Sequence, residues 1–354
     1  KSKKNLEKIN LIFMIRLLLS YFFNKSLSQA NYYNLKIVYH SICHIKNTLK
    51  IKINNENEDE SNNIFMRFGK NSFNSYYKPL FLTYFFIFLR IICEFIMRYN
   101  GFKNYYSSKT NINYWYKINS KSNNHNPLMF IHGFGAGIIP YISYLIKLSE
   151  DTTIICPVLP NISNVYFHPL KWNVSKNDFF PDFKLMFHEI NNIFEQHKIS
   201  KVNIIAHSFG TFLLSGLILD STIRKKIDKK IYIDPVCFHT ERYKIYKSVD
   251  FVKGLKNGGF FKKMREYLIY YFIYLDIYLK YVTKRNLFSM DYLWGNYRYI
   301  DNNSLIVLSE LDEITPSKGI YDELSKLSKI KNILWIKKAH HGDLFLDSKF
   351  NYYL

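Results

Sequence analysis

The chain contains few cysteines, and this scarcity excludes some classes of protein. Its 354 residues include 4 cysteines, Cys43, Cys93, Cys156 and Cys237, which are too few and too scattered for a disulfide framework. No group of cysteines and histidines has the spacing of a zinc site, and no pattern requires a metal or an organic cofactor. We expect Cys93 and Cys156, which lie in apolar runs, to be buried packing residues.

Acidic residues are also scarce. The chain has 28 Asp and Glu against 49 Lys and Arg, a formal net charge of +21. Such a balance ordinarily suggests nucleic acid or an anionic membrane as the partner. However, Lys, Asn, Ile, Tyr and Phe are abundant together, as in proteins encoded by A+T-rich sequences, so part of the charge is compositional background. No RNP-type motif or basic arm is present, and we expect an anionic membrane surface rather than nucleic acid.

The sequence also lacks an uninterrupted apolar run long enough to span a bilayer comfortably. Residues 11–23 form a short run that contains Arg16, and residues 80–97 contain Arg90 and Glu94. The latter two are four residues apart, so on a helix they share one face and can pair. An embedded hairpin, an amphipathic interfacial helix and a helix buried against the rest of the protein all fit this pattern.

The strongest chemical signal is a serine between small residues. The apolar run 202–205 leads into residues 206–210, Ala-His-Ser-Phe-Gly, which is typical of a strand that turns sharply into a helix. Ser208 lies at the apex, where its hydroxyl is clear of the backbone and a base can take its proton. The usual pattern is Gly-x-Ser-x-Gly, and Ala206 is the mildest departure from it.

A glycine-rich loop lies upstream of this serine. The short apolar run 128–131 is followed by residues 132–137, His-Gly-Phe-Gly-Ala-Gly. Acyl transfer through a tetrahedral intermediate needs backbone N–H groups directed at the developing oxyanion. We expect Phe134 and Phe209 to supply them; a plain tight turn is the alternative explanation of the glycines. Four further residues are expected to support the two loops: His132, Gly133, Gly135 and Gly210.

Three acids follow a later buried strand, at residues 304–308. They are Glu310, Asp312 and Glu313. We favour Asp312 as the partner of a histidine, because its short side chain gives a firmer hydrogen bond. Asp234, at the end of an earlier strand, is the alternative acid.

Two histidines follow the last predicted strand, at residues 332–336. His340 and His341 precede Gly342, which allows the loop to bring one of them back over the sheet as a base. A nucleophilic serine, an acid and a histidine in this order along the chain characterise one particular scaffold.

Strands alternate with helical stretches through this part of the chain, which predicts a parallel sheet with helices on both faces. The motifs then meet at the carboxyl ends of the strands, where ligands bind in such sheets. The expected strands are 112–118, 128–131, 152–156, 202–205, 231–233, 304–308 and 332–336, and the expected helices are 138–148 and 183–197.

With these motifs, residues 112–354 resemble the α/β-hydrolase fold superfamily. The resemblance implies an α/β fold with a mostly parallel, doubly wound sheet, and Ser208 as nucleophile, Asp312 as orienting acid and His341 as general base. His341 fits because Gly often follows the base in this family, although His340 then occupies a position that is commonly Gly. Residues 233–238 and 292–294 are similar to a poorly characterised eukaryotic, membrane-associated branch.

The resemblance also implies a domain plan. Residues 111–354 would form the catalytic domain, with an aromatic-rich cap inserted at about 237–300. Outside the resemblance, we expect residues 1–110 to form an N-terminal helical region, in which segments 11–23 and 80–97 are candidates for association with a membrane.

The expected function is that of a serine hydrolase, esterase-like or lipase-like. An apolar, aromatic cap favours a hydrophobic acyl substrate; a structural cap packed on the sheet, with no part in selectivity, is the alternative. We expect cleavage of an ester or other acyl bond at a membrane surface, without cofactor or metal. Acyl transfer to another alcohol by the same three residues is one alternative. A non-catalytic binding or scaffold protein is the other.

Overall fold

The computed structural model describes residues 8–23, 25–49, 52–54, 80–106, 112–120, 126–159, 162–163, 183–238, 299–327 and 332–346. Nearly all of the expected cap lies outside these residues. The chain divides into two compact units, Lys1–Phe73 with Thr283–Asp291 and Asn74–Val282 with Tyr292–Leu354. This division places segment 80–97 in the larger unit, whereas the sequence suggested a boundary near residue 110.

The described part of the smaller unit is a helical hairpin with two short strands. Its elements are β1 (Lys8–Asn10), α1 (Leu11–Phe23), the 3-10 helix η2 (Leu27–Gln29), α2 (Tyr32–Leu49) and β2 (Lys52–Asn54). The strands β1 and β2 pair in parallel. The two helices bury Met14, Leu19 and Val38 in a small core of their own. No described helix, in either unit, is long and apolar enough to cross a membrane.

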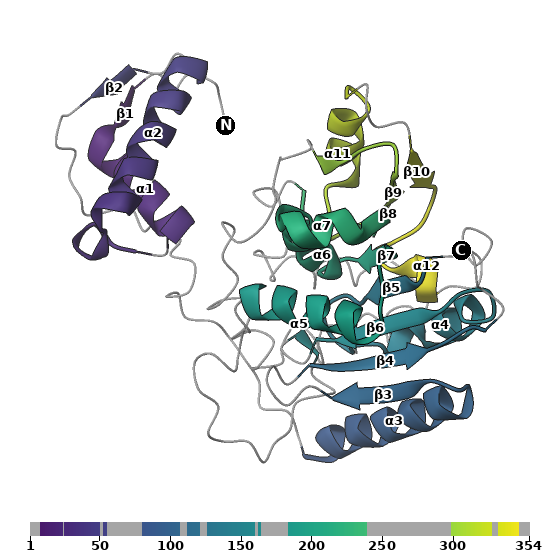
Figure 1. Cartoon of the computed structure of the whole chain (residues 1–354). Coiled ribbons are helices and arrows are strands. Elements are labelled where there is room, and N and C mark those ends of the chain that lie inside the picture. Colours follow the sequence, from purple (N-terminus) through teal and green to yellow (C-terminus); the bar gives the residue numbers. More distant parts are fainter. Residues whose placement is uncertain are drawn as a thin grey trace. The chain divides into compact units, whose positions relative to one another are not determined.

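The larger unit is built on an eight-stranded sheet with the order β10-β9-β8-β7-β5-β6-β4-β3 (Figure 1). The strands are β3 (Lys103–Tyr106), β4 (Asn113–Lys117), β5 (Leu128–Ile131), β6 (Ile154–Val158), β7 (Val202–His207), β8 (Ile227–Ile233), β9 (Ser304–Ser309) and β10 (Ile333–Ile336). The helices are α3 (Leu80–Tyr99), η3 (Ile139–Tyr141), α4 (Ile142–Leu148), α5 (Phe183–Gln196), α6 (Gly210–Leu219), α7 (Ser221–Lys226), α11 (Ser317–Leu324) and α12 (Asp343–Leu346).

Only β4 runs against the other described strands of this sheet. It pairs antiparallel with both β3 and β6, while all the remaining neighbours pair in parallel. The parallel strands therefore point their carboxyl ends at one edge of the sheet. This is the mostly parallel arrangement that the sequence predicted.

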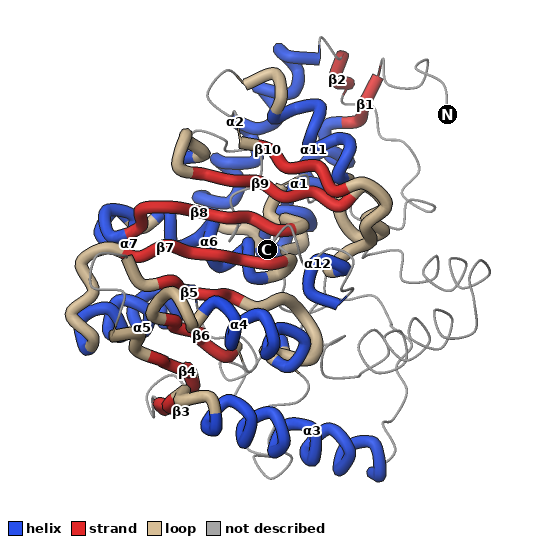
Figure 2. The backbone as a smooth tube through the Cα atoms, turned by 90° about the vertical axis from the view of Figure 1, so that its right-hand side faces the viewer, coloured by secondary structure: helices blue, strands red, loops and turns tan. Residues whose placement is uncertain are grey.

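Helices cover both faces of the sheet (Figures 1 and 2). On one face, η3, α4 and α12 pack over strand residues such as Phe130, Ile205 and Val307, which belong to one buried cluster. On the other face lie α5 and α6, and the α6 residues from Gly210 to Ile218 are all buried. Because successive strand residues point to opposite faces, short strands that are buried on both faces read as continuous apolar runs.

Every expected strand is present, with boundaries that differ by a few residues. The sequence did not predict β3, which pairs Lys103 to Tyr106 with Tyr116 to Asn113 and so extends the sheet by one strand. Cys93 and Cys156 are buried, as expected, and all four cysteines are free.

Candidate active site

Ser208 lies at the tight turn between β7 and α6. Its backbone has a φ of +49°, in the left-handed region that non-glycine residues rarely adopt, and its N–H donates to the Ile233 carbonyl oxygen at 2.9 Å. The next helix begins at Gly210, where a Cβ would lie only 2.5 Å from the Ile131 carbonyl oxygen. Glycine is therefore required two residues after the serine, because α6 begins directly against the backbone of β5. Ala206 is fully buried.

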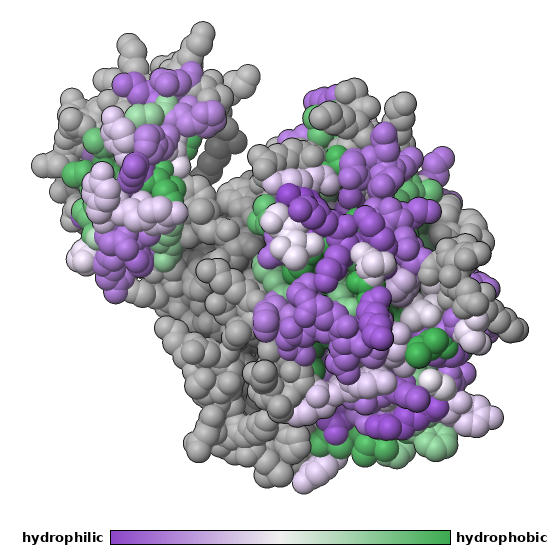
Figure 3. All heavy atoms as spheres, viewed as in Figure 1, coloured by the Kyte–Doolittle hydropathy of each residue, from purple (hydrophilic) through white to green (hydrophobic). Residues whose placement is uncertain are grey.

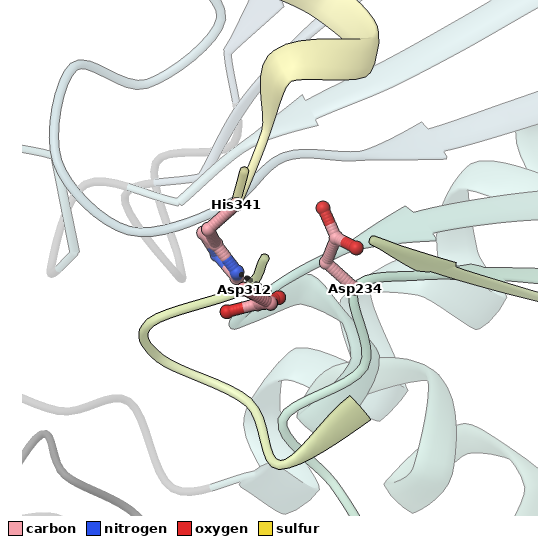
Figure 4. Close-up of side chains that lie close together, drawn as sticks. All are labelled: Asp234, Asp312 and His341. Carbon is pink, nitrogen blue, oxygen red and sulfur yellow. Dashed lines mark hydrogen bonds and ion pairs between the residues drawn. The ribbon is translucent and has the colours of Figure 1, made fainter. Parts of the chain in front are cut away.

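The structure brings Ser208, His341 and Asp312 into one hydrogen-bonded row. His341 Nε2 lies 2.8 Å from Ser208 Oγ, and His341 Nδ1 lies 2.8 Å from Asp312 Oδ2. Figure 4 shows the imidazole reaching from the loop before α12 towards Asp312, which comes from the loop after β9. In the neutral imidazole, Nδ1–H donates to the carboxylate and Nε2 is free to accept the serine proton.

Main-chain donors fix the Asp312 carboxylate. Its Oδ1 accepts the N–H groups of Ile314 and Thr315, each at 2.7 Å, and the Thr315 hydroxyl donates to Oδ2. Burial by itself would lower the pKa of His341, but the charge of Asp312 and its hydrogen bond outweigh this effect and raise the pKa to about 9. The acid thus orients the imidazole and stabilises the imidazolium that proton transfer would create.

The competing acids and the second histidine have other partners. Glu313 is paired with His340 Nδ1, and Glu310 accepts the Lys338 N–H at 2.8 Å. The backbone N–H of His340 donates to Asp343 at the start of α12. The geometry therefore distinguishes between the two histidines that the sequence left open, since it is His341 that contacts Ser208.

Asp234, the alternative acid, is fully buried and binds two loops rather than the imidazole. Its Oδ1 accepts the Ser309 N–H at 3.0 Å and its Oδ2 accepts the Gly342 N–H at 2.9 Å. Burial and the nearby Asp312 raise the pKa of Asp234 to about 6. Asp234 thereby fixes the backbone on each side of the site and adds negative charge near His341.

Asp234, Asp312 and His341 together offer three metal-ligand atoms within 4.8 Å of one another (Figure 4). Hydrogen bonds account for this proximity, because both Asp234 oxygens accept backbone N–H groups and His341 Nδ1 faces Asp312. These three residues are consequently assigned to the serine site.

The glycine-rich loop lies directly beside the serine. A Cβ at Gly133 would come within 3.1 Å of Ser208 Cβ and 2.9 Å of His207 Nδ1, so only glycine allows this approach. The rings of Phe134 and Phe209 neighbour each other, with centroids 6.0 Å apart. Within the described residues, neither the Phe134 nor the Phe209 N–H donates a backbone hydrogen bond.

His132 supports this loop from within the core. Its Nε2 accepts the Leu159 N–H at 2.9 Å, so the proton lies on Nδ1 and is donated to the Gly133 carbonyl oxygen at 2.7 Å. Burial lowers the pKa of His132 to about 4, and it remains neutral. Gly135 continues the loop with a φ of +119° and donates its N–H to Ile162.

Sequence reasoning assigned no role to a buried pair beneath the serine, Tyr141 and His207. The Tyr141 hydroxyl accepts the Gly133 N–H at 3.2 Å and lies 2.8 Å from His207 Nδ1. Burial, together with the neighbouring His341 and His132, holds the pKa of His207 well below its usual value. The pair links the glycine-rich loop to the serine turn. Its two members come from separate elements, Tyr141 from η3 and His207 from β7, and no motif in the sequence predicts their contact.

No family model matches the chain, and no curated protein matches its sequence. Among solved structures, it is similar to a membrane phospholipase A described as a novel bacterial virulence factor. The TM-score is 0.51 at 14% identity, over 77% of this chain and 90% of that one. The chain is also similar to a carboxylesterase from Nitrososphaera gargenis (TM-score 0.48, 15% identity, 71% and 95% covered). A third is naproxen esterase from Bacillus subtilis (TM-score 0.46, 14% identity, 74% and 95% covered). The likeness concerns the fold.

Proposed function

Because the chain has the α/β-hydrolase fold, we propose that it is a serine hydrolase that cleaves an ester or other acyl bond. One observation carries the proposal: His341 lies 2.8 Å from the Ser208 oxygen and, through its other nitrogen, 2.8 Å from Asp312. This row contains a nucleophile, a base and an acid that orients the base.

The reaction would proceed in two stages. Ser208 Oγ bonds to the acyl carbon while His341 Nε2 takes the hydroxyl proton, and the resulting oxyanion accepts N–H groups from Phe134 and Phe209. The intermediate then expels an alcohol, which receives its proton from His341. Water attacks the acyl-enzyme with His341 again as base, which releases a carboxylic acid and restores the serine.

A hydrophobic, lipid-like acyl group fits the surroundings of the serine best. The rings of Phe134 and Phe209, whose N–H groups we propose as oxyanion donors, have centroids 6.0 Å apart, and the Phe212 ring lies 5.3 Å from that of Phe209. The sequence expected to form the cap contains aromatic stretches such as 267–275, Tyr-Leu-Ile-Tyr-Tyr-Phe-Ile-Tyr-Leu. Aromatic and aliphatic side chains bind a ligand by burying its apolar surface, which favours a hydrophobic substrate over a charged one.

Labelling with a fluorophosphonate tests the serine directly, because the probe reacts with activated serines. We expect the wild-type protein to label, Ser208→Ala to lose the label, and His341→Ala to label far more slowly. Ser325→Ala, which alters an exposed serine, is the matched control and should label as the wild type does. A folded wild type that does not label, or a label that persists in Ser208→Ala, would overturn the proposal.

The acyl specificity is measured next with p-nitrophenyl esters of graded chain length. We expect kcat/KM to rise with chain length until the apolar surface is filled. Adding a competing alcohol separates hydrolysis from acyl transfer, since a transferase would form a new ester in place of the free acid.

A further inference from the structure

The helix α3 is mostly apolar, and the described part of the fold packs against only one of its sides. Cys93 and Met97 are buried in the core beside α4, with Phe102 just beyond the helix. On the opposite side, six aromatic residues are between 50% and 84% exposed: Phe81, Tyr84, Phe85, Phe88, Phe95 and Tyr99. Monomeric soluble proteins rarely expose a contiguous apolar surface of this extent.

The charges within α3 do not interrupt the exposed stripe. At 100° per residue, Phe81, Phe88 and Phe95 fall on one side of the helix, whereas Arg90 and Glu94 fall near the opposite side. Arg90 and Glu94 pair with each other at 3.4 Å, one turn apart. The stripe is therefore continuous and uncharged, although the sequence of this segment contains charged residues.

The direction of α3 brings the stripe to the edge of the sheet that carries the serine. The helix ends in a tight turn in which Gly101 has a φ of +83° and the Phe102 N–H donates to the Met97 carbonyl oxygen. The chain then reverses into β3, beside which α3 lies (Figures 1 and 2). Since β3 points the same way as the parallel strands, the N-terminal end of α3 lies towards their carboxyl ends, as Ser208 does.

We propose that the exposed stripe of α3 docks on the surface of an anionic lipid bilayer, with the helix in the plane of the interface. The helix does not need to span the bilayer for this, because an interfacial helix buries only one face among the head groups and upper acyl chains. Figure 3 shows hydrophobic surface along the lower border of the molecule, over α3. The proposal builds on the proposed function, since it would deliver the serine to acyl groups at that surface.

Charge favours a lipid surface over a second copy of the chain. The chain has a formal net charge of +21, so two copies repel each other, whereas anionic head groups attract it. Arg98 lies in the last turn of α3 and the exposed Lys103 follows it. Both residues are exposed, although the Arg98 guanidinium also lies 5.6 Å from the centroid of the Trp115 ring, and both add to the attraction for anionic head groups.

Vesicle co-sedimentation of the full-length protein tests the docking. Phe88 and Ile91, one helical turn apart on α3, are 59% and 55% exposed. With phosphatidylcholine vesicles containing phosphatidylserine, we expect the wild type to sediment and the double variant Phe88→Ser with Ile91→Ser to bind about tenfold more weakly. Leu219→Ser is the matched control, because Leu219 is 47% exposed on α6, and its vesicle binding should be unchanged. Unchanged thermal unfolding of the double variant establishes that the fold is intact.

Phe88→Trp provides a positive readout, because it retains the apolar surface. Its additional fluorescence over the wild type should be quenched by lipids with brominated acyl chains. Equal binding of the wild type and the double variant would overturn the proposal, and so would absence of quenching. A wild-type dimer that becomes a monomer in the double variant, without vesicle binding, would instead identify a second copy as the occupant.

Activity assays separate this proposal from the proposed function. Hydrolysis of a soluble short-chain ester should be the same in the wild type and the double variant, whereas hydrolysis of an ester embedded in vesicles should fall with the binding. A protein that binds vesicles through α3 but hydrolyses neither ester would retain the docking surface and lose the proposed function.

Discussion

Replacing Asp312 with asparagine is the sharpest test of the candidate site, because the main chain dictates how the amide must lie. Oδ1 of Asp312 accepts two N–H groups, from Ile314 and Thr315, each at 2.7 Å. Only the oxygen of an asparagine can take that position. Its NH₂ group must then occupy the position of Oδ2, which faces His341 Nδ1.

This orientation forces the wrong tautomer on His341. The amide would donate to Nδ1, so the proton of a neutral imidazole moves to Nε2, next to Ser208. A nitrogen that carries a proton cannot accept one, and the serine loses its base. We expect Asp312→Asn to lower kcat by about 10⁴-fold with little change in the fold, which is the size of effect that a wrong tautomer produces in serine proteases.

The pH dependence provides a second readout of the same substitution. In the wild type, the pKa of His341 is raised to about 9, so the acylation rate should rise with pH up to about that value. Removing the negative charge of Asp312 lowers this pKa, and the residual rate of Asp312→Asn should level off at a lower pH. Stopped-flow hydrolysis of a p-nitrophenyl ester between pH 6 and 10 would measure both quantities.

A small loss of rate would refute this reasoning. If Asp312→Asn keeps more than about a tenth of the wild-type kcat, Asp312 does not set the tautomer, and Asp234→Asn becomes the variant to measure. Glu313→Gln is the matched control, because Glu313 pairs with His340 rather than with His341. It should leave kcat unchanged.

Three further predictions concern stability. Gly210→Ala places a Cβ 2.5 Å from a main-chain carbonyl oxygen and should lower the free energy of unfolding, measured in urea, by about 1–3 kcal/mol. Gly216→Ala should lower it less, because its Cβ meets only a phenylalanine ring that can move. Equal costs would contradict this. Tyr141→Phe leaves the buried Gly133 N–H without its acceptor and should cost about 1–3 kcal/mol, an effect absent if water replaces the hydroxyl. Because the pKa of His341 is raised to about 9 in the folded protein, the protonated imidazole stabilises the fold fully below pH 6.5, and this contribution is lost as the pH rises through about 9. The free energy of unfolding should therefore fall by up to about 3 kcal/mol over that interval. In His341→Ala the fall should be smaller.

The sequence predicted the sheet well because its strands are short, apolar and separated by helical stretches. It also predicted which ends of the strands would meet. Ser208, Asp312 and His341 follow β7, β9 and β10, which lie within four adjacent strands of one parallel sheet. Residues at the carboxyl ends of parallel strands share one edge, so their proximity follows from topology alone.

Sequence alone favoured Asp312 but kept Asp234 as the alternative, because both follow strands that end at that edge. The choice depends on backbone conformation. Asp234 has a φ of +44°, and its side chain accepts N–H groups from Ser309 and Gly342. Asp312 instead sits in a turn whose N–H groups bind Oδ1, and its Oδ2, which also accepts the Thr315 hydroxyl, faces His341. The residue types in these two turns do not reveal from the sequence which aspartate faces the histidine.

The position of α3 was also beyond sequence reasoning, for a different reason. A helix usually packs by its most apolar face, but the side of α3 that lies opposite Arg90 and Glu94 is the exposed one, so periodicity points to the wrong face. The structure supplies the answer by burying Cys93 and Met97 and exposing Phe88. It also shows that Arg90 and Glu94 pair with each other, whereas in the sequence they looked like interruptions of an apolar segment.

The candidate site depends on its backbone as much as on its side chains. Gly133 lets the glycine-rich loop approach Ser208, and Gly210 lets α6 begin against the β5 backbone, each more closely than a Cβ would allow; Gly342 adopts a φ of +76° beside His341. Main-chain N–H groups hold both carboxylates: those of Ile314 and Thr315 bind Asp312, and those of Ser309 and Gly342 bind Asp234. Main-chain donors cannot change rotamer, so the acid and the base keep their geometry without a substrate. Such preorganisation lowers the cost of reaching a charged transition state.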